Sequence, residues 1–348
     1  MVYLTSLRGL AALLVVFFHV KHYLLAFSEE FWFWFVKNGF LAVDFFFLLS
    51  GFILAYTYHA RMSDLTLQKF FTFMGLRFAR IYPLHLLVLL LFVLVPLAHW
   101  ITGRELPEQG FSLASFFAKL FLMDTWWTGY FETWNVPSWS ISAEWMAYLL
   151  FPVLLYLCQT LKKGFIPLGL LALSALMIVT FKLRGEASIG QDINNLGVLR
   201  CLIEFCMGIL VFRLSASFRI GQGAGYLLLI AALLAFYAGV KAGISDYYFA
   251  PLCFAGILLG LISTSGVIHR ALSIKPLVYI GEISYSIYMV HYWVLYMMTM
   301  FFLETGEIPS LIWIGLYTLA TIVFSAFTYH FVEVPFRNRI AGGLRGKL

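Results

Sequence analysis

The chain has little charge for its size. Of its 348 residues only 11% are Asp, Glu, Lys or Arg, whereas 62% are hydrophobic, and the mean hydropathy is +0.90. A soluble domain is roughly a quarter charged and nearer half apolar, so this composition excludes a soluble enzyme and leaves no room for a sizeable soluble domain. The net charge of +6 does not indicate nucleic-acid binding, because membrane proteins carry Lys and Arg in their inner loops.

Cysteine is also scarce. The four cysteines, Cys158, Cys201, Cys206 and Cys253, all lie in apolar segments, where a thiol behaves as a small hydrophobe. No pair of them has the spacing of a zinc site with a histidine nearby, so we predict neither a disulfide nor a metal. The first apolar run has no basic segment before it and no small-residue cleavage site after it, and we expect the first helix to be retained.

Long apolar stretches follow one another along the sequence. Crossing a bilayer as a helix takes about 17–25 residues, and ten windows meet that length. They fall near residues 7–27, 39–58, 80–101, 138–161, 165–182, 198–214, 223–240, 248–265, 278–302 and 311–332. We therefore predict an all-α polytopic membrane protein, a single domain over residues 1–348 with about ten transmembrane helices. The shorter apolar segment 112–123 is interpreted as an interfacial or re-entrant helix.

The charges of the loops predict an orientation. With the N-terminus inside, Lys and Arg gather in the inner loops while Asp and Glu are biased to the outer ones, as the positive-inside rule requires for the basic residues. An even number of helices then places both termini in the cytoplasm. In this topology arginines lie toward the cytoplasm, histidines near mid-depth and carboxylates toward the outer face. The residues concerned are Arg8, Arg77 and Arg80, then His19 and His291, then Asp44 and Glu144.

The first window combines an arginine and a histidine. Arg8 and His19 are 11 residues apart, close to three helical turns, so both side chains project from one face about 16 Å apart along the axis. Ionisable residues inside a membrane segment are costly and usually mark function, and imidazole is suited to moving a proton near neutral pH. The alternatives are a topological anchor for Arg8 and a helix-packing role for His19.

Further acids and small residues stand in the apolar windows. Asp44 lies among aromatic residues, where a carboxylate needs a partner or a proton. The alternative to a catalytic role is a structural ion pair with an outer-loop Lys or Arg. Ser50 and Gly51 are interpreted as a close helix contact. Glu204 is expected to pair with Arg200, four residues before it in the same window.

Three other groups of polar residues share helix faces. Arg77 and Arg80, at i,i+3, place two guanidinium groups on one side, which suits phosphate or, alternatively, lipid headgroups. Ser140, Glu144 and Tyr148 form a stripe at four-residue spacing, unless Glu144 is simply an acid in contact with water at the outer interface. The third group is Ser284, Tyr288 and His291, for which interhelical hydrogen bonding is the alternative.

Taken in order, these motifs resemble the acyltransferase 3 family of integral-membrane acyltransferases. The resemblance covers essentially the whole chain, and each motif is weak by itself. The matching runs are Arg8-x10-His19, Val43-Asp44-Phe45-Phe46 with Ser50-Gly51-Phe52, Arg77-x-x-Arg80, Trp139-Ser-x-Ser142-x-Glu144, Ser284-Tyr285-x-x-Tyr288-x-x-His291 and Val332-Glu333-x-Pro335. The chain is expected to be a stand-alone form, without a fused extracellular esterase-like domain.

The resemblance implies a donor, an acceptor and several roles. The donor would be an acyl-coenzyme A, usually acetyl-CoA, entering from the cytoplasm. The acceptor would be a hydroxyl, commonly on a cell-envelope or exported carbohydrate, and the protein would reside in the bacterial inner membrane. His19 matches the essential histidine of the family, Arg8, Arg77 and Arg80 match arginines expected near coenzyme A, and Glu144 matches its acid. The remaining motif residues are interpreted as substrate-binding or supporting, namely Ser142, Tyr148, Ser284, Tyr288 and His291.

These assignments lead to a mechanistic hypothesis. Neutral His19 would take the proton of the acceptor hydroxyl, and the alkoxide would attack the thioester. Asp44 or Glu144 would orient the imidazole. A covalent acyl-histidine is the other route. The alternative function is a secondary transporter or flippase for a saccharide or lipid-linked substrate, and a non-catalytic sensor or scaffold is a third. The identity of the acceptor, the length of the acyl group and the oligomeric state stay open.

Overall fold

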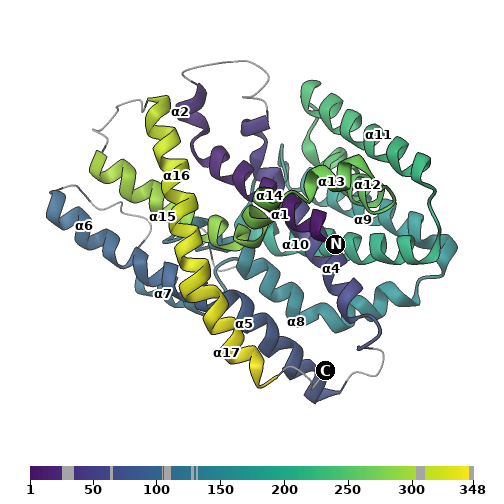
Figure 1. Ribbon diagram of the computed structural model, residues 1–348, viewed down its shortest axis with the longest axis horizontal. Helices are drawn as coiled ribbons and strands as arrows, with labels where there is room; N and C mark the ends of the chain where they lie inside the picture. The colour runs from purple at the N-terminus through teal and green to yellow at the C-terminus, as the bar shows by residue number, and fades with distance from the viewer. Residues whose placement is uncertain are drawn as a thin grey trace.

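The structure is a computed structural model of the chain. It describes residues 1–25, 35–62, 66–103, 105, 111–126, 129–130, 132–302 and 310–344. All regular elements in these ranges are helices (Figure 1). The N-terminal half contains α1 (Val2–His19), α2 (Lys21–Leu25), η1 (Gly39–Leu41), α4 (Ala42–Tyr58), α5 (Leu67–Phe92), α6 (Leu94–Thr102), α7 (Leu113–Leu120), η2 (Val136–Ser138) and α8 (Trp139–Thr160).

The second half is built in the same way. It contains η3 (Lys163–Phe165), α9 (Ile166–Leu183), α10 (Ile193–Ser217), α11 (Gln222–Lys241), η4 (Asp246–Tyr248), α12 (Ala250–Ile262), α13 (Val267–Leu272), α14 (Lys275–Glu282), α15 (Ser284–Phe302), α16 (Leu311–Thr328), η5 (Tyr329–Glu333) and α17 (Val334–Gly342). Among the described residues, eight helical runs are long and apolar enough to cross a membrane. The prediction of an all-α polytopic membrane protein is confirmed, and the placement of the termini stays a prediction.

Each predicted window coincides with helical structure, with four differences. The window at 80–101 spans the end of α5 and most of α6, which Val93 separates. The first window was predicted to run to residue 27, but α1 ends at His19, so the histidine stands at the end of the helix instead of well inside it. The window at 248–265 contains α12, which has only 13 residues. The window at 278–302 is broken at Ile283 into α14 and α15. Just before this break, Gly281 lies directly on the backbone of α1 at Thr5.

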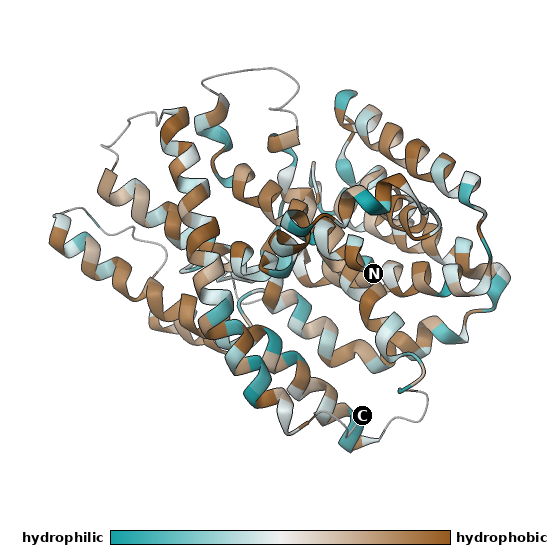
Figure 2. Cartoon of the chain, viewed as in Figure 1, coloured by the Kyte–Doolittle hydropathy of each residue, from teal (hydrophilic) through white to brown (hydrophobic). Residues whose placement is uncertain are grey.

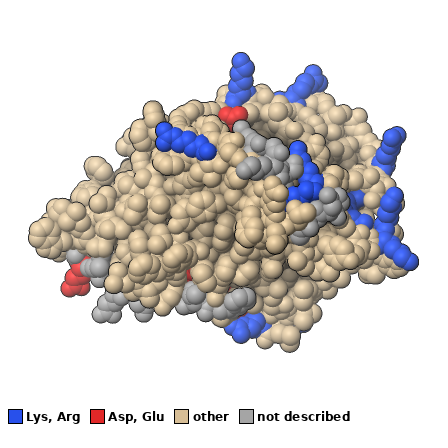
Figure 3. Space-filling view, turned by 90° about the horizontal axis from the view of Figure 1, so that it is seen from below, with Lys and Arg blue, Asp and Glu red and all other residues tan. Residues whose placement is uncertain are grey.

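The outside of the bundle is apolar and its charges are peripheral. Figure 2 shows that the long helices are mostly hydrophobic along their length. Figure 3 shows a face dominated by uncharged residues, with Lys and Arg projecting around its rim. Leucines such as Leu168 and Leu171 on α9, and Leu227 and Leu234 on α11, are exposed. Because no protein group covers them, these faces suit contact with lipid.

The centre of the bundle is the contact between α4 and α10. Gly51 on α4 and Gly208 on α10 lie so close to the opposite helix that a Cβ at either would overlap a backbone carbonyl, of Phe205 and Leu48 respectively. Small residues permit such an approach between membrane helices. The predicted close helix contact at Ser50 and Gly51 is thereby confirmed for Gly51.

The segment predicted as an interfacial or re-entrant helix contains α7, which begins at a Ser112 cap. Lys119 near its end is fully buried, and its Nζ donates to Asp124 at 2.6 Å. Burial lowers the pKa of the Lys119 amine, and the adjacent Asp124 carboxylate opposes that shift. The Lys119 carbonyl accepts a hydrogen bond from Nε2 of His85 at 2.8 Å, so α7 packs inward against α5.

Candidate active site

Contacts among α1, α5 and α15 show which residues of these helices lie at the same height in the bundle. Gly9 of α1 lies against Gly281, and His19 at the end of the same helix lies against His291. On α15, Tyr285 donates from its hydroxyl to the Ile81 carbonyl of α5 at 2.6 Å. The same two helices meet again where Nε1 of Trp293 donates to the Leu91 carbonyl at 3.1 Å, ten residues further along α5 and eight along α15.

This register gives the bundle two polar levels. Arg8, Arg80 and Ser284 stand at one level, and the two histidines stand at the other. The levels are about ten residues apart, or roughly 15 Å along the helices. A ligand that joins them must therefore be long and narrow.

A cavity of about 310 Å³ starts at the arginine level. Its walls come from α1, α4, α5, α8 and α15. One side is apolar and is built largely by α4. The polar residues that line it are Arg8, Ser50, Thr57, Tyr58, Arg77, Arg80, Ser140, Glu144, Tyr148, Ser284, Tyr285 and Tyr288. Most of the predicted site residues thus meet in one space, although they come from four separate helices.

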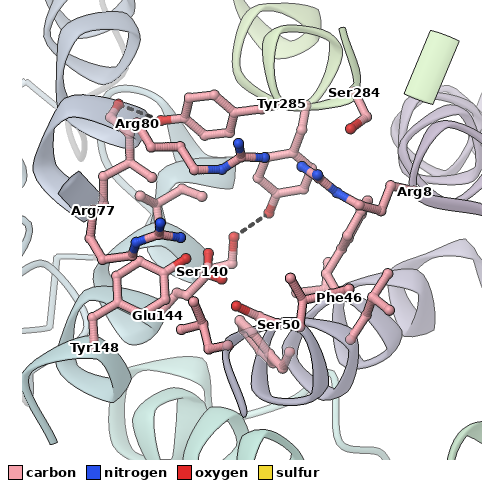
Figure 4. Close-up of a pocket in the computed structure, with 18 of the residues that line it drawn as sticks. Arg8, Phe46, Ser50, Arg77, Arg80, Ser140, Glu144, Tyr148, Ser284 and Tyr285 are labelled. Atoms are coloured by element: carbon pink, nitrogen blue, oxygen red, sulfur yellow. Dashed lines mark hydrogen bonds between the residues drawn. The ribbon is translucent and has the colours of Figure 1, made fainter. Parts of the chain in front are cut away.

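The three arginines of the cavity differ in how they are held. Nη2 of Arg77 donates to the Tyr58 hydroxyl at 3.2 Å, and the guanidinium lies 5.6 Å from the centre of that ring. Arg8 and Arg80 have no hydrogen bond or ion pair within the described part of the chain. Figure 4 shows their guanidinium groups directed toward each other across the cavity. Two cations with no described carboxylate within ion-pair distance leave room for an anion.

Among the described residues, Glu144 of α8 is the only carboxylate that lines the cavity. Ser140, Glu144 and Tyr148 all reach the cavity wall, as their four-residue spacing predicts. Figure 4 shows Glu144 beside Tyr148, on the side of the cavity where Arg77 lies. One carboxylate against three guanidinium groups leaves the cavity with an excess of positive charge.

Toward the histidine level, the cavity ends at a hydroxyl pair. The hydroxyls of Ser140 and Tyr288 are 2.6 Å apart, and both lie within hydrogen-bond distance of the Pro137 carbonyl, at 3.2 and 2.9 Å. Each hydroxyl can donate one hydrogen bond. One of the two donates to the other hydroxyl, and the second donates to the Pro137 carbonyl. Tyr288 and Ser140 therefore brace α15 against the start of α8.

His19 and His291 face each other beyond this end of the cavity, and neither lines it. Nδ1 of His291 lies 2.7 Å from the Tyr288 carbonyl, and Nδ1 of His19 lies 2.9 Å from the Val15 carbonyl. Since a carbonyl only accepts, both Nδ1 atoms carry the proton in the neutral rings. Nε2 of His291 is then an acceptor, 3.2 Å from Nδ1 of His19. This leaves Nε2 of His19 as a lone pair without a partner among the described residues.

Asp44 was considered as a residue that could orient His19, but its partner in the structure is Arg200. Its two oxygens accept from Nε and Nη2 of Arg200, each at 2.5 Å, and both side chains are buried. The expectation that Arg200 pairs with Glu204 is wrong, because Arg200 reaches across to α4 instead. Its guanidinium also lies 5.2 Å from the ring centre of Trp139. Planar bidentate geometry favours this tertiary pair.

Ser142 also lies outside the cavity. Its hydroxyl donates to the Leu122 carbonyl at 2.8 Å and accepts from the Thr125 hydroxyl at 2.9 Å. It thus ties the segment after α7 to α8. Sequence reasoning overlooked Tyr58 and Thr57, which line the cavity. Thr57 lies seven and Tyr58 eight residues after Ser50, which puts them on the same face of α4. This helical spacing was available in the sequence.

A family model described as an acyltransferase domain matches residues 1–330. The chain belongs to the acyltransferase 3 family. The O-acetyltransferase OatA of Staphylococcus aureus (strain NCTC 8325 / PS 47) is 28% identical over 367 residues, which cover 97% of this chain and 58% of that protein. The protein SACOL0978 of S. aureus (strain COL), provisionally named an O-acetyltransferase, is 26% identical over 368 residues, 96% of this chain and 57% of its own length.

The chain therefore spans less than two thirds of the length of these relatives. No solved structure matches it significantly. Membership of the acyltransferase 3 family and a bundle of apolar helices together describe a multi-pass membrane protein of an acyl-transferring family.

Proposed function

We propose that the protein is a membrane O-acyltransferase that takes an acyl group, most simply acetyl, from coenzyme A and transfers it to a hydroxyl. The observation that carries this proposal is the cavity with three arginines and a single carboxylate. Coenzyme A carries several phosphate charges, for which guanidinium groups are suitable partners. Family membership supports acyl transfer, and the names of the relatives OatA and SACOL0978 support acetyl transfer to oxygen.

The shape of the site supports a donor of this kind. Its phosphates would lie at the level of Arg8 and Arg80, and the narrow arm would follow the apolar wall of α4 toward Tyr288. The thioester would then approach the histidine level, roughly 15 Å away. In this arrangement Arg77 stands one turn further from the histidines than Arg80, where it would contact the more distant phosphate.

His19 is the base in this proposal. Nε2 of neutral His19 takes the proton of the acceptor hydroxyl while the oxygen attacks the thioester carbonyl. The new ester C–O bond forms, the C–S bond breaks, and coenzyme A leaves as a thiolate that takes up the proton. Throughout, the Nδ1 proton of His19 is held by the Val15 carbonyl and by Nε2 of His291.

His291 therefore takes the orienting role that the sequence had suggested for Asp44 or Glu144. An orienting partner fixes the tautomer and stabilises the imidazolium that forms during transfer. Asp44 is assigned a structural role, since Arg200 occupies both of its oxygens. Glu144 remains a cavity residue and is proposed to contact the donor. The acceptor is proposed to be a carbohydrate hydroxyl of the cell envelope, with the protein in the bacterial inner membrane.

The direct test is donor binding by the purified protein in lipid nanodiscs. Titration calorimetry with acetyl-CoA should show saturable binding, and an Arg77→Ala/Arg80→Ala variant should lose it. Arg184→Ala is the matched control, because Arg184 is half exposed and pairs with Asp192 away from the cavity. Absence of saturable binding at millimolar donor would refute the proposal, and the next assay would measure substrate flux instead of transfer.

A further inference from the structure

The break between α14 and α15 places the start of a long helix at the cavity. Ser284 opens α15, a helix of 19 residues that ends at Phe302. The first turn of a helix presents N–H groups that have no carbonyl partner within that helix, and it carries a partial positive charge. This combination attracts anions. A helix start alone is insufficient grounds for a site, so the side chains around it decide.

Ser284 supplies the second observation. Ser284 is 1% exposed, and its Oγ has no hydrogen-bond partner among the residues that the structure describes. It nevertheless lines the cavity. Leaving a buried hydroxyl without a partner is unfavourable, and a ligand in the cavity would supply the missing acceptor. Ser284 therefore marks a position at which a bound group accepts a hydrogen bond.

The charges around Ser284 identify the chemistry of that group. Figure 4 shows Ser284 at the end of the cavity where the guanidinium groups of Arg8 and Arg80 converge. Neither arginine has a carboxylate within ion-pair distance among the described residues. The nearby Ser286 is different, because its hydroxyl donates to Glu333 at 3.0 Å. The unsatisfied hydroxyl and the two unpaired cations thus share one space.

We propose that the start of α15, with Ser284, Arg8 and Arg80, is the subsite for the diphosphate of coenzyme A. This inference rests on the proposed function and specifies which part of the donor binds there. The diphosphate is attached directly to the pantetheine arm. From this level the arm would run along the cavity toward Tyr288 and the histidines. Arg77, one turn further from the histidines on α5, is left for the phosphate on the ribose.

Donor fragments separate this subsite from its neighbours. We would measure the binding of coenzyme A, dephospho-coenzyme A, 4′-phosphopantetheine and pantetheine to the wild type and to Ser284→Ala in nanodiscs. The variant should bind the three ligands that contain the inner phosphate about tenfold more weakly, which is the value of one hydrogen bond to a charged group. Pantetheine, which has no phosphate, should bind both proteins equally.

Two further variants control for structure. Ser284→Thr keeps the hydroxyl and should retain most of the affinity for coenzyme A. Ser174→Ala removes a buried hydroxyl of α9 that lies outside the cavity, and it should bind every ligand as the wild type does. Thermal unfolding of each variant would verify that the bundle is intact.

The other outcomes are equally informative. An effect that disappears with dephospho-coenzyme A would place the ribose phosphate at Ser284 and overturn the assignment. An effect that persists with pantetheine would mean that Ser284 contacts the arm or the thioester, which also overturns it. Wild-type binding with no change in Ser284→Ala would refute the subsite but leave the proposed function standing. Failure of the wild type to bind coenzyme A would refute both.

Discussion

The two sets of arginines in this bundle are partnered in opposite ways. Arg200 is 1% exposed, and Asp44 pairs with it through two hydrogen bonds of 2.5 Å. Arg8 and Arg80 are half-buried and have no carboxylate within ion-pair distance among the residues that the structure describes. A buried charge is tolerated when its partner is fixed, whereas an unpaired one is costly.

This difference distinguishes arginines that hold the bundle together from arginines that are available to a ligand. At Arg200 the charge is neutralised inside the protein, and the pair ties α10 to α4 at the centre of the bundle. At Arg8 and Arg80 no described carboxylate lies within ion-pair distance, so a bound anion can supply the neutralising charge. Buried ionisable residues in a membrane protein are therefore best judged by whether their partners are present. The histidines are intermediate, because His19 has a partner at Nδ1 but none at Nε2 among the described residues.

The largest expected effect concerns that unpartnered Nε2 atom. Replacing His19 with Ala should lower acyl transfer about 10²–10⁴-fold, the usual contribution of a general base, while donor binding persists. The exposed His22 just beyond α1 provides the matched variant His22→Ala, which should transfer at the wild-type rate. Radiolabelled acetyl-CoA and an acceptor polysaccharide would measure both. Wild-type turnover in His19→Ala would exclude the histidine from the chemistry.

Replacing the partnered arginine, Arg200, should lower the stability of the protein. Arg200→Ala leaves Asp44 buried without its partner, and breaking such a pair costs about 3–5 kcal/mol. Arg80→Ala removes a charge that has no partner, so it should leave the unfolding temperature unchanged or raise it. Thermal unfolding in lipid nanodiscs compares the two variants. Equal stability of the two would remove the distinction between structural and ligand-binding arginines.

The neutral partner of His19 is expected to have a smaller effect. His291→Ala should lower the rate constant for transfer about 10–100-fold, by analogy with the loss of an outer partner that orients a reactive imidazole. His291→Gln keeps a side chain able to accept from Nδ1 of His19 and should recover part of the rate. Donor affinity should be unchanged in both variants. A loss that appears in donor affinity instead would mean that His291 supports the cavity and not the base.

The sequence predicts the helices and the cavity face better than it predicts pairing. Periodicity is local, so the spacing of Ser140, Glu144 and Tyr148 correctly puts them on one wall. Pairing is tertiary, and Asp44 and Arg200 are 156 positions apart. A local rule therefore favoured Glu204 as the partner of Arg200, because an i,i+4 acid is visible in sequence and a neighbouring helix is not.

The same limit applies to the histidines and to the helix break. His19 and His291 are 272 positions apart, and only the parallel register of α1 and α15 brings them together. The break at Ile283 was also not predicted, because residues 278–302 are mostly apolar despite Glu282 and His291, and they satisfy the length rule for one helix. Gly281 allows the close approach at this point, but its contact with Thr5 of α1 joins residues that are far apart in the sequence.

The smallest effect is that of salt, which should weaken donor binding at Arg8 and Arg80 but leave the Asp44–Arg200 pair unaffected. Donor phosphates in an open, positively charged cavity are partly exposed to counterions, and the Debye length falls from about 10 Å at 0.1 M to about 3 Å at 1 M. The dissociation constant for acetyl-CoA should therefore rise several-fold over that range. The Asp44–Arg200 pair is excluded from solvent, so the difference in unfolding temperature between the wild type and Arg200→Ala should not change. If the difference in unfolding temperature also becomes smaller as salt is added, ions reach the Asp44–Arg200 pair as well as the donor site. Solvent exclusion would then not be what separates the structural pair from the donor site.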